Sequence, residues 1–546
     1  MKPRTLAALA TSVAITSIAT HAGVYEDRER DWRNGAIVYQ VLVDRFAPPA
    51  DLEAKRALYP APKRLLAWAE TPKAGAYLPD QKLSAHELDF WGGDLASTTA
   101  RLDHVQRLGA DALYLNPIHL AYTNHKYDAL DFQAVSPEYG TRDDFRRLAA
   151  DAKRRGLKVV LDGVFNHMGR NAPIFREAFA AHEREREGHR AAPSPERAPP
   201  GGARAAGGGS TYRDWFAIGP QYEGGARVWS GFQNHPELNL ENAAVRRYLY
   251  EGKDSVVRSW LRDGADGWRL DTAYEFGYRI LREMTDAAHK EKPGSLVVGE
   301  IVNYPDRWLR ATDAVMNFTL RMIVLGFASG EIAPATAARM AERLVRDGGI
   351  EPMLKSWVVI DNHDIPRIAT QLPDPARRRL VQALQFTLPG APNIYYGAEL
   401  GMTGGADPEN RGPMRWDLVR DDNPELQWMR QLIALRKAHR ALRIGDFRLA
   451  ESQRLLAFER HTDKALETLL VVANPGDTPV RETLLVANAS LMDDTPLVDL
   501  LGANGGKPVT GFGAGVVNVE VPPRTVMVLK PVPKALGGYN RYKRVP

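Results

Sequence analysis

The sequence predicts an α/β fold in which an eight-stranded (β/α)8 barrel is followed by a C-terminal antiparallel β-sandwich. Two observations predict it. Eight short apolar runs alternate with segments of helical spacing, and after about residue 438 short strands punctuated by Gly, Pro, Asn and Asp replace this alternation. The eight runs are Ala36–Phe46, Ala112–Ile118, Lys158–Phe165, Gly267–Thr272, Ser295–Ile301, Ala314–Leu320, Ser356–Asp361 and Asn393–Glu399.

The runs and the segments between them each support the barrel. Several runs are apolar on both faces, which is typical of parallel strands that helices cover on both sides. The segment Thr141–Arg155 has amphipathic spacing and starts at a threonine, a favoured helix N-cap. Eight alternations of strand and helix are the pattern of a TIM barrel, in which catalytic residues lie at the C-terminal ends of the strands.

One connection of the barrel is too long for a simple loop. Residues 168–237, between the third and fourth strands, are predicted to form an inserted loop domain. Within it, Ala181–Ser210 is rich in Arg, Glu, Ala, Pro and Gly and poor in large apolar residues. We therefore predict a mobile surface insertion over Ala181–Ser210.

The C-terminal part of the chain has the pattern of a separate β domain. Its alternating runs are Leu455–Arg460, Leu469–Ala473, Val480–Val486 and Val516–Val521. We expect the barrel over residues 23–437, the sandwich over 438–532, and a polar tail over 533–546 whose role the sequence does not define.

The first 22 residues are predicted to be a signal peptide. Lys2 and Arg4 supply the positive start, Leu6–Ala19 is uncharged and mostly apolar, and Thr20-His21-Ala22 offers a small-residue cleavage site. The alternative is a short N-terminal helix of the mature protein. We expect a secreted protein, either periplasmic or extracellular.

Composition excludes several classes of protein. With no cysteine, the chain has no disulfide, no Cys-ligated zinc and no Cys nucleophile. The net charge of +5 comes from 72 basic and 67 acidic residues that are interleaved, so we expect no nucleic-acid partner. No apolar stretch beyond the N-terminal segment reaches the roughly 20 residues that span a bilayer, so we expect no membrane insertion.

Three carboxylates follow or end predicted barrel strands: Asp271, Glu300 and Asp364. Closing the barrel brings such strand ends together. Hydrolysis of an acetal needs one acid that protonates the leaving oxygen and one carboxylate that faces the anomeric carbon, about 5–5.5 Å apart in retaining enzymes. Glu300 follows an apolar run, and burial there would raise its pKa as a general acid requires.

Other polar residues at these strand ends fit the same site. Arg269 lies two positions before Asp271 and faces the same side of the strand, so its charge is expected to keep Asp271 ionised. His167 and His363 can donate hydrogen bonds to sugar hydroxyls. Each of these residues alone could be a solvated strand-end group. Their concentration at several strand ends favours a catalytic site.

Four motifs carry a family resemblance. They are Asp162–His167 (DGVFNH), Gly267–Asp271 (GWRLD), Val298–Ile301 (VGEI) and Asn362–Asp364 (NHD). Together they resemble the signature regions of glycoside hydrolase family 13, the α-amylase family, over about residues 35–430. The resemblance implies that Asp271 is the nucleophile, that Glu300 is the general acid/base, and that Asp364 grips sugar hydroxyls and stabilises the distorted ring.

Further stretches resemble the neopullulanase, cyclomaltodextrinase and maltogenic amylase branch. They are Asn124–Phe132, Gly267–Glu275 and Phe386–Gly405. This likeness implies that Tyr127 is an aromatic platform for a sugar ring and that Glu275 lies near the acceptor side. A core aromatic is the alternative for Tyr127. Family members often bind calcium beside the first motif, where Asn166 matches a ligand position; structural hydrogen bonding is the alternative for Asn166.

We therefore predict a retaining α-glucan hydrolase that cleaves α-1,4 bonds in maltooligosaccharides, cyclodextrins, starch or pullulan, with transglycosylation as a side activity. A dedicated α-transglucosylase is the first alternative. A non-catalytic carbohydrate-binding protein is the second, although it would be expected to lack one of the three carboxylates. The branch usually carries an N-terminal β-domain that supports a dimer. Here the barrel is expected directly after the signal peptide, which leaves the oligomeric state open with a monomer favoured.

Overall fold

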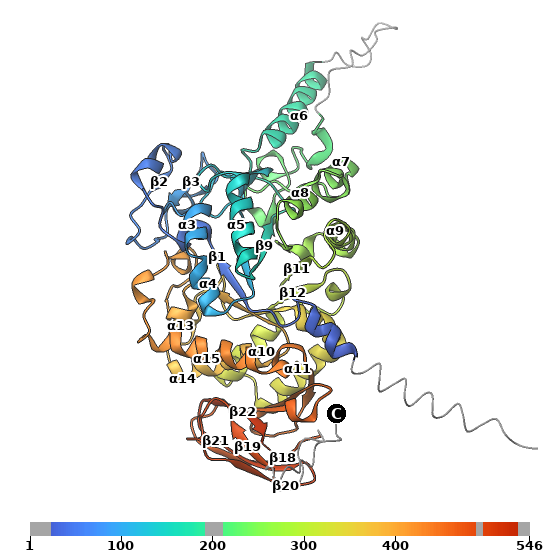
Figure 1. Ribbon diagram of the computed structural model, residues 1–546. Helices are drawn as coiled ribbons and strands as arrows, with labels where there is room; N and C mark the ends of the chain where they lie inside the picture. The colour runs from blue at the N-terminus through green and yellow to red at the C-terminus, as the bar shows by residue number, and fades with distance from the viewer. Residues whose placement is uncertain (1–22, 192–210, 488–494, 533–546) are drawn as a thin grey trace, which may run out of the picture.

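Eight parallel strands close into a barrel in the order β1-β14-β13-β12-β11-β10-β9-β6 in the computed structural model, which describes residues 23–191, 211–487 and 495–532 (Figure 1). The strands are β1 (Val38–Val41), β6 (Ala112–Leu115), β9 (Lys158–Gly163), β10 (Gly267–Leu270), β11 (Leu296–Ile301), β12 (Ala314–Asn317), β13 (Trp357–Val359) and β14 (Ala391–Tyr395). Seven predicted apolar runs each contain one barrel strand, and the eighth, Asn393–Glu399, overlaps β14, so the predicted barrel is confirmed.

The inside of the barrel is a packed core. Large and small side chains from seven of the eight strands share it, all except β10, and among them are Trp357 and Tyr114, whose ring centroids are 5.0 Å apart. Because these side chains fill the middle of the barrel, polar groups gather where the strands end.

Helices surround the barrel and cover the outer faces of its strands (Figure 1). The longer ones are α5 (Arg142–Arg154), α8 (Val256–Arg262), α9 (Gly277–Glu291), α10 (Phe318–Ser329), α11 (Pro334–Gly348), α14 (Pro375–Thr387) and α15 (Pro424–Ala438). The helix predicted over Thr141–Arg155 is α5. The Thr141 hydroxyl caps it by accepting from the N–H of Asp144. None of the helices in the described ranges is long and apolar enough to cross a bilayer.

The insertion after β9 differs from its prediction. Residues Ala181–Ala191, predicted to be part of a mobile surface insertion, continue the helix α6 (Pro173–Ala191), which projects from the barrel at the top of Figure 1. The sequence analysis gave no helix there, although Ala, Glu and Arg, which are typical of solvated segments, are also strong helix formers. His182 Nε2 lies 2.9 Å from the carbonyl oxygen of Arg213, which joins the helix to the chain returning toward the barrel. Residues 192–210 lie outside the described residues.

Eight antiparallel strands form the C-terminal sheet in the order β15-β16-β17-β22-β19-β20-β21-β18. They are β15 (Asp446–Leu449), β16 (Leu456–His461), β17 (Leu469–Asn474), β18 (Val480–Leu485), β19 (Pro496–Asp499), β20 (Val509–Gly513), β21 (Val516–Val521) and β22 (Thr525–Pro531). The sheet folds over itself, because side chains of β17 and β22 share one core with side chains of β18 and β21. The predicted signal peptide and polar tail lie outside the described residues.

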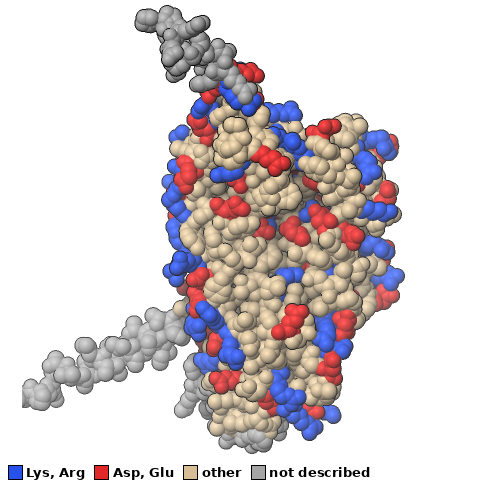
Figure 2. All heavy atoms as spheres, turned by 180° about the vertical axis from the view of Figure 1, so that it is seen from behind, with Lys and Arg blue, Asp and Glu red and all other residues tan. Residues whose placement is uncertain are grey.

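The other face of this sheet joins the core around the barrel. Phe458 and Val471 belong to the same apolar cluster as the barrel helices, and the sheet lies against α11 and α14 (Figure 1). On the face in Figure 2, basic and acidic side chains are interspersed, so their near balance in the sequence also holds locally.

Two buried arginines tie the barrel to its surroundings through backbone carbonyls. Arg436 of α15 is fully buried and donates to the carbonyls of Gly35 (3.2 Å), Phe386 (2.6 Å) and Gly390. Arg460 of β16 donates to the carbonyls of Thr387 (2.7 Å) and Gly445 (3.0 Å), and its burial lowers its pKa to about 9.

Arg436→Met is expected to lower the free energy of unfolding by about 3 kcal/mol or more. The variant leaves three buried carbonyl oxygens without a donor, at about 1–3 kcal/mol each. Urea denaturation followed by tryptophan fluorescence measures the change. Arg430→Met is the matched control, because Arg430 lies on the same helix, is 41% exposed and pairs with Asp421. Such surface pairs contribute about 1 kcal/mol or less. Equal denaturation midpoints in the two variants would contradict the role of Arg436.

Candidate active site

The predicted site residues converge at the C-terminal ends of neighbouring strands. In the barrel register, Arg269 of β10 lies beside Asp162 of β9 on one side and Val298 of β11 on the other. Asp271 follows β10 directly, Glu300 lies in β11, and His363 and Asp364 follow β13. Asp271, Glu300 and Asp364 line a cavity of about 570 Å³, whereas Asp162, Arg269 and His363 are buried behind it. Its lining is Ser84, His86, Glu87, His125, Tyr127, His167, Trp229, Phe232, His235, Asp271, Thr272, Tyr274, Glu300, Val302, Asp364, Asp407 and Arg411.

The centre of the site is the guanidinium of Arg269, which is fully buried. Its Nη1 donates to Asp162 Oδ1 and to Asp271 Oδ1, each at 2.8 Å. Its Nη2 lies 3.1 Å from Glu300 Oε1. One cation therefore holds three carboxyl groups that come from three adjacent strands. The other oxygen of Glu300 accepts from the N–H of Thr272 at 2.9 Å.

Burial and the sharing of Arg269 determine the pKa values of Asp271 and Glu300. Burial raises the pKa of Asp271 well above its ordinary value, and Arg269 offsets that rise only in part. Burial also raises the pKa of Glu300, against the opposing effect of Arg269. Arg269 acts in the expected direction and lowers the pKa of Asp271, but burial, the largest influence, and the neighbouring carboxyl groups raise that pKa more. The protons on these groups are therefore interdependent.

Tyr127 joins the site through its hydroxyl. Its oxygen lies 2.9 Å from Asp162 Oδ2, to which it donates, and 2.6 Å from His363 Nε2. The rings of Tyr127 and His363 stack at 5.3 Å with an angle of 4° between their planes. Tyr127 is packed against the core on one side and lines the cavity on the other, so it combines the two alternatives drawn from the sequence.

Asp364 lines the cavity next to His363. Its side chain is 44% exposed, with Oδ1 3.3 Å from an Nη of Arg411 and Oδ2 3.1 Å from His363 Nε2. Arg411 also contacts Asp407 at 3.2 Å and donates to the backbone carbonyl of His363 at 2.8 Å. Asp364 is thus held from two sides while it remains open to a ligand.

The inserted segment supplies an aromatic wall to the cavity. Trp229 stacks on His167, with ring centroids 5.3 Å apart, and on Phe232 at 5.4 Å. His235 lies 4.7 Å from the His167 ring. Burial lowers the pKa of His235 to about 3 and that of His167 well below its ordinary value, so both rings are neutral at physiological pH.

Glu275 is not brought to the cavity. It ends the short turn η8 (Ala273–Glu275), where Tyr274 lines the cavity but Glu275 is exposed and lies outside the lining. Successive residues of such a turn point in different directions, so nearness to Asp271 in sequence did not place Glu275 in the site.

Asn166 is buried next to His167, and its Nδ2 has no hydrogen-bond partner among the described residues. Calcium is bound by six to eight oxygens, which include amide and backbone carbonyl oxygens, and the side-chain oxygen of Asn166 could supply one of them. Within the described ranges, no group of three or more His, Cys, Asp or Glu side chains could hold a metal ion. Calcium at Asn166 therefore stays a prediction.

Several site residues were missed from the sequence. Gln40 of β1, Tyr114 of β6 and Asn393 of β14 are fully buried polar residues within barrel strands. Their signal was a polar side chain inside an otherwise apolar run. Arg411 carried no such signal, and its role beside Asp364 required the tertiary structure.

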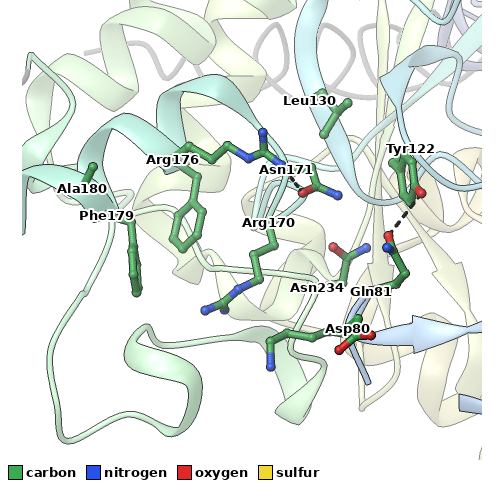
Figure 3. Close-up of a pocket in the computed structure, with 12 residues that line it drawn as sticks. Asp80, Gln81, Tyr122, Leu130, Arg170, Asn171, Arg176, Phe179, Ala180 and Asn234 are labelled. Atoms are coloured by element: carbon green, nitrogen blue, oxygen red, sulfur yellow. Dashed lines mark hydrogen bonds between the residues drawn. The ribbon is translucent and has the colours of Figure 1, made fainter. Parts of the chain in front are cut away.

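A second pocket of about 720 Å³ lies between the inserted segment and the Tyr77–Ser84 hairpin region (Figure 3). Its labelled residues include Tyr122, Arg170, Asn171 and Phe179. Much of its polar surface is already paired, since Tyr122 donates to Gln81 and Arg176 donates to Asn171. None of the three predicted catalytic carboxylates lines it.

A closed (β/α)8 barrel with buried acids grouped around one arginine, beside a cavity walled by aromatic rings, defines a glycosidase type of site. Comparison with known protein families supports the assignment of a glycosidase site. Residues 40–422 match the model of the alpha-amylase catalytic domain. The chain belongs to the alpha-amylase family and is a glycoside hydrolase of that family.

Individual relatives within the family show which of its enzymes are similar to this chain. The chain is 32% identical over 459 residues to a cyclomaltodextrinase from a Bacillus species, covering 81% of this chain and 73% of that protein. It is 32% identical over 434 residues to neopullulanase 2 from Thermoactinomyces vulgaris, covering 77% of this chain and 65% of that protein. Among solved structures, the cyclic α-maltosyl-(1→6)-maltose hydrolase from Arthrobacter globiformis has a TM-score of 0.72 at 28% identity, covering 92% and 99% of the two chains.

Proposed function

We propose that this protein is a retaining hydrolase of α-1,4-glucosidic bonds in maltooligosaccharides, cyclodextrins, starch or pullulan. The observation that carries the proposal is the contact of Arg269 with both Asp271 and Glu300 at the edge of the cavity. Two carboxyl groups that touch neighbouring nitrogens of one guanidinium lie close enough to act on one glycosidic bond. This closeness supports the retaining mechanism, which needs a shorter separation than the inverting one.

In the proposed reaction, a carboxylate oxygen of Asp271 attacks the anomeric carbon and forms a glucosyl ester. The bond to the leaving oxygen breaks, and protonated Glu300 donates its proton to that oxygen. Ionised Glu300 then removes a proton from water, whose oxygen attacks the same carbon and releases Asp271. Among the carboxyl groups that share Arg269, the proposal places the proton on Glu300, whose pKa burial raises, and leaves Asp271 as the ionised partner.

The other residues of the cavity would bind the sugar. Asp364, exposed to the cavity and held by Arg411, can accept hydrogen bonds from sugar hydroxyls. The Tyr127 ring offers a flat apolar surface to a pyranose, and the aromatic wall at Trp229 and Phe232 offers another. His167 lines the same cavity and can hydrogen-bond a sugar hydroxyl there, whereas both ring nitrogens of His363 already contact Gln40 and Tyr127.

The substrate assignment rests on the relatives. Their names give cyclomaltodextrin and pullulan as substrates of proteins similar to this chain. A glucosyl ester can be intercepted by a sugar hydroxyl as well as by water, so transglycosylation is proposed as a side activity. The exposed Phe232 ring, stacked on Trp229, could hold such an acceptor sugar.

Asp271→Asn and Glu300→Gln are each expected to lower kcat on maltotriose about a thousandfold or more with the fold intact. Asp364→Asn is expected to act mainly on kcat as well. Asp143→Asn is the matched control, since Asp143 is exposed on α5 and pairs with Arg146. Circular dichroism checks the fold of each variant.

A substrate with a good leaving group separates the two roles. α-Glucosyl fluoride needs no protonation to lose fluoride, so Glu300→Gln is expected to form the glucosyl ester from it whereas Asp271→Asn is not. Mass spectrometry of the trapped protein detects the ester. Near-normal turnover of maltotriose by either variant would refute the assigned roles.

The identity of the glucan is tested by separate incubations with β-cyclodextrin, soluble starch and pullulan. Linear malto-oligosaccharides from β-cyclodextrin, released with the α anomer formed first, are the expected result. Chromatography identifies the products, and proton NMR of the fresh products gives the anomer. Mostly longer or branched products from maltotriose would favour a dedicated transglucosylase, and binding without products would indicate a non-catalytic protein.

We also propose that the protein is exported, on the support of the charged and then apolar pattern of residues 1–22. Expression of the full chain in a Gram-negative host should place activity in the periplasm or medium, on a protein whose N-terminus follows residue 22. A full-length protein confined to the cytoplasm would contradict export.

A further inference from the structure

A series of buried hydrogen bonds links residues of β1 and β14 to residues that follow β6 and β13. Asn393 Nδ2 donates to Gln40 Oε1 at 3.0 Å. Gln40 Nε2 donates to Asn116 Oδ1 at 3.0 Å and lies 3.0 Å from His363 Nδ1. Gln40, Asn116 and Asn393 are fully buried, and His363 is 1% exposed, so these groups depend on one another for partners.

The series ends at the Tyr127 hydroxyl, where the hydrogens can be counted. A hydroxyl has one hydrogen to donate and two lone pairs to accept with. Three groups contact this oxygen: Asn116 Nδ2 at 2.9 Å, His363 Nε2 at 2.6 Å and Asp162 Oδ2 at 2.9 Å. If Asn116 and His363 both donate, the hydroxyl hydrogen goes to Asp162 and every group is satisfied.

If the side-chain amides of Gln40 and Asn116 are turned by 180°, the hydrogens around the Tyr127 hydroxyl no longer match the acceptors. With Gln40 Oε1 turned toward His363, Nδ1 would carry the hydrogen and Nε2 would become an acceptor. Asn116 would have to turn as well and present its oxygen to Tyr127. One hydroxyl hydrogen would then face three acceptors. The unprotonated Nε2 would also face Asp364 Oδ2, which lies 3.1 Å away.

We propose that Gln40 is a positioning residue of the active site, which fixes His363 as the tautomer protonated at Nε2 and so directs the hydroxyl hydrogen of Tyr127 onto Asp162. Gln40 acts through His363 and Tyr127 and does not line the cavity. Asn393 orients the Gln40 amide from the far side.

This direction matters because Asp162 competes with Asp271 for Arg269. Asp162 Oδ2 accepts from Tyr114 and Tyr127, while its Oδ1 shares Arg269 Nη1 with Asp271. If the Tyr127 hydrogen turned away, Asp162 would lose one donor and attract Arg269 more strongly. The bond that orients Asp271 would then weaken. A residue of β1 thereby affects the carboxylate at the end of β10.

The tautomer can be measured directly in the unmodified protein. The 15N chemical shift of an imidazole nitrogen differs widely between its protonated and unprotonated forms. In protein labelled with 15N-histidine, His363 is expected to show an unprotonated Nδ1 and a protonated Nε2. Comparison with His363→Asn assigns the signals. A protonated Nδ1 in His363 of the wild-type protein would overturn the proposal without any variant of Gln40.

Gln40→Met tests the role of Gln40 itself. The variant keeps the side-chain size but removes the donor to Nδ1, so the His363 signals are expected to move toward a mixture of tautomers. The kcat is expected to fall about 10- to 100-fold with a smaller change in KM. Losses of this size are typical when a residue that orients a functional histidine through a hydrogen bond is replaced. Unchanged His363 shifts in a folded Gln40→Met protein would show that Gln40 does not set the tautomer.

Gln382→Met is the matched control. Gln382 of α14 is equally buried at 1% exposure, but it takes no part in the series of hydrogen bonds that leads to Tyr127. The same substitution at Gln382 is expected to leave the His363 signals, the kcat and the KM unchanged. The predicted effect on kcat rests on the proposed hydrolysis, whereas the predicted tautomer of His363 does not. A wrong tautomer would contradict the role of Gln40, and an absence of hydrolysis would contradict the proposed function alone.

Discussion

The buried guanidinium of Arg269 is the interaction on which the rest of the site depends. A cation that has lost all contact with water is stable only where carboxylates and hydrogen-bond acceptors replace the water. Arg269 finds them on β9, just after β10 and on β11, so its contacts require three neighbouring strands in one register. Barrel closure and the charge balance of the site are therefore parts of the same constraint.

The same constraint explains why the acids behave together. A single positive charge cannot fully compensate Asp162, Asp271 and Glu300, and burial opposes ionisation of each. A proton retained on one carboxyl group relieves the others. A glycosidase of the retaining type needs one protonated and one ionised acid, which is the state that such sharing favours.

Polar residues inside the barrel strands serve this arrangement. Gln40, Tyr114 and Asn393 replace apolar side chains in an interior that otherwise packs tightly, and their hydrogen bonds meet at His363 or Asp162. Hydrogen bonds stabilise such groups in a core. With Asp162 ionised, every contact of the Tyr127 hydroxyl is used when Asn116 and His363 donate to it.

Much of the fold and of the central site followed from local patterns. Eight apolar runs, the Thr141 cap, and charged residues at strand ends are properties of short segments, so the barrel, the C-terminal sheet and the grouping of Asp271, Glu300 and Asp364 were predictable. The helical continuation through Ala181–Ala191 was missed, because one composition suits both a solvated segment and a helix. Glu275, predicted near the acceptor side, is exposed beside the cavity residue Tyr274 and does not line the cavity, because a turn decides the direction of each side chain.

The sequence by itself determined the order of strands and helices, the absence of cysteine chemistry, and the acids able to carry out acetal hydrolysis. Only the tertiary structure decided that one arginine is shared by three carboxyl groups, that Arg411 supports Asp364, and that Gln40 reaches His363. The physical reason is distance along the chain. Gln40 and His363 are 323 positions apart in sequence, and closure of the barrel is what makes them neighbours.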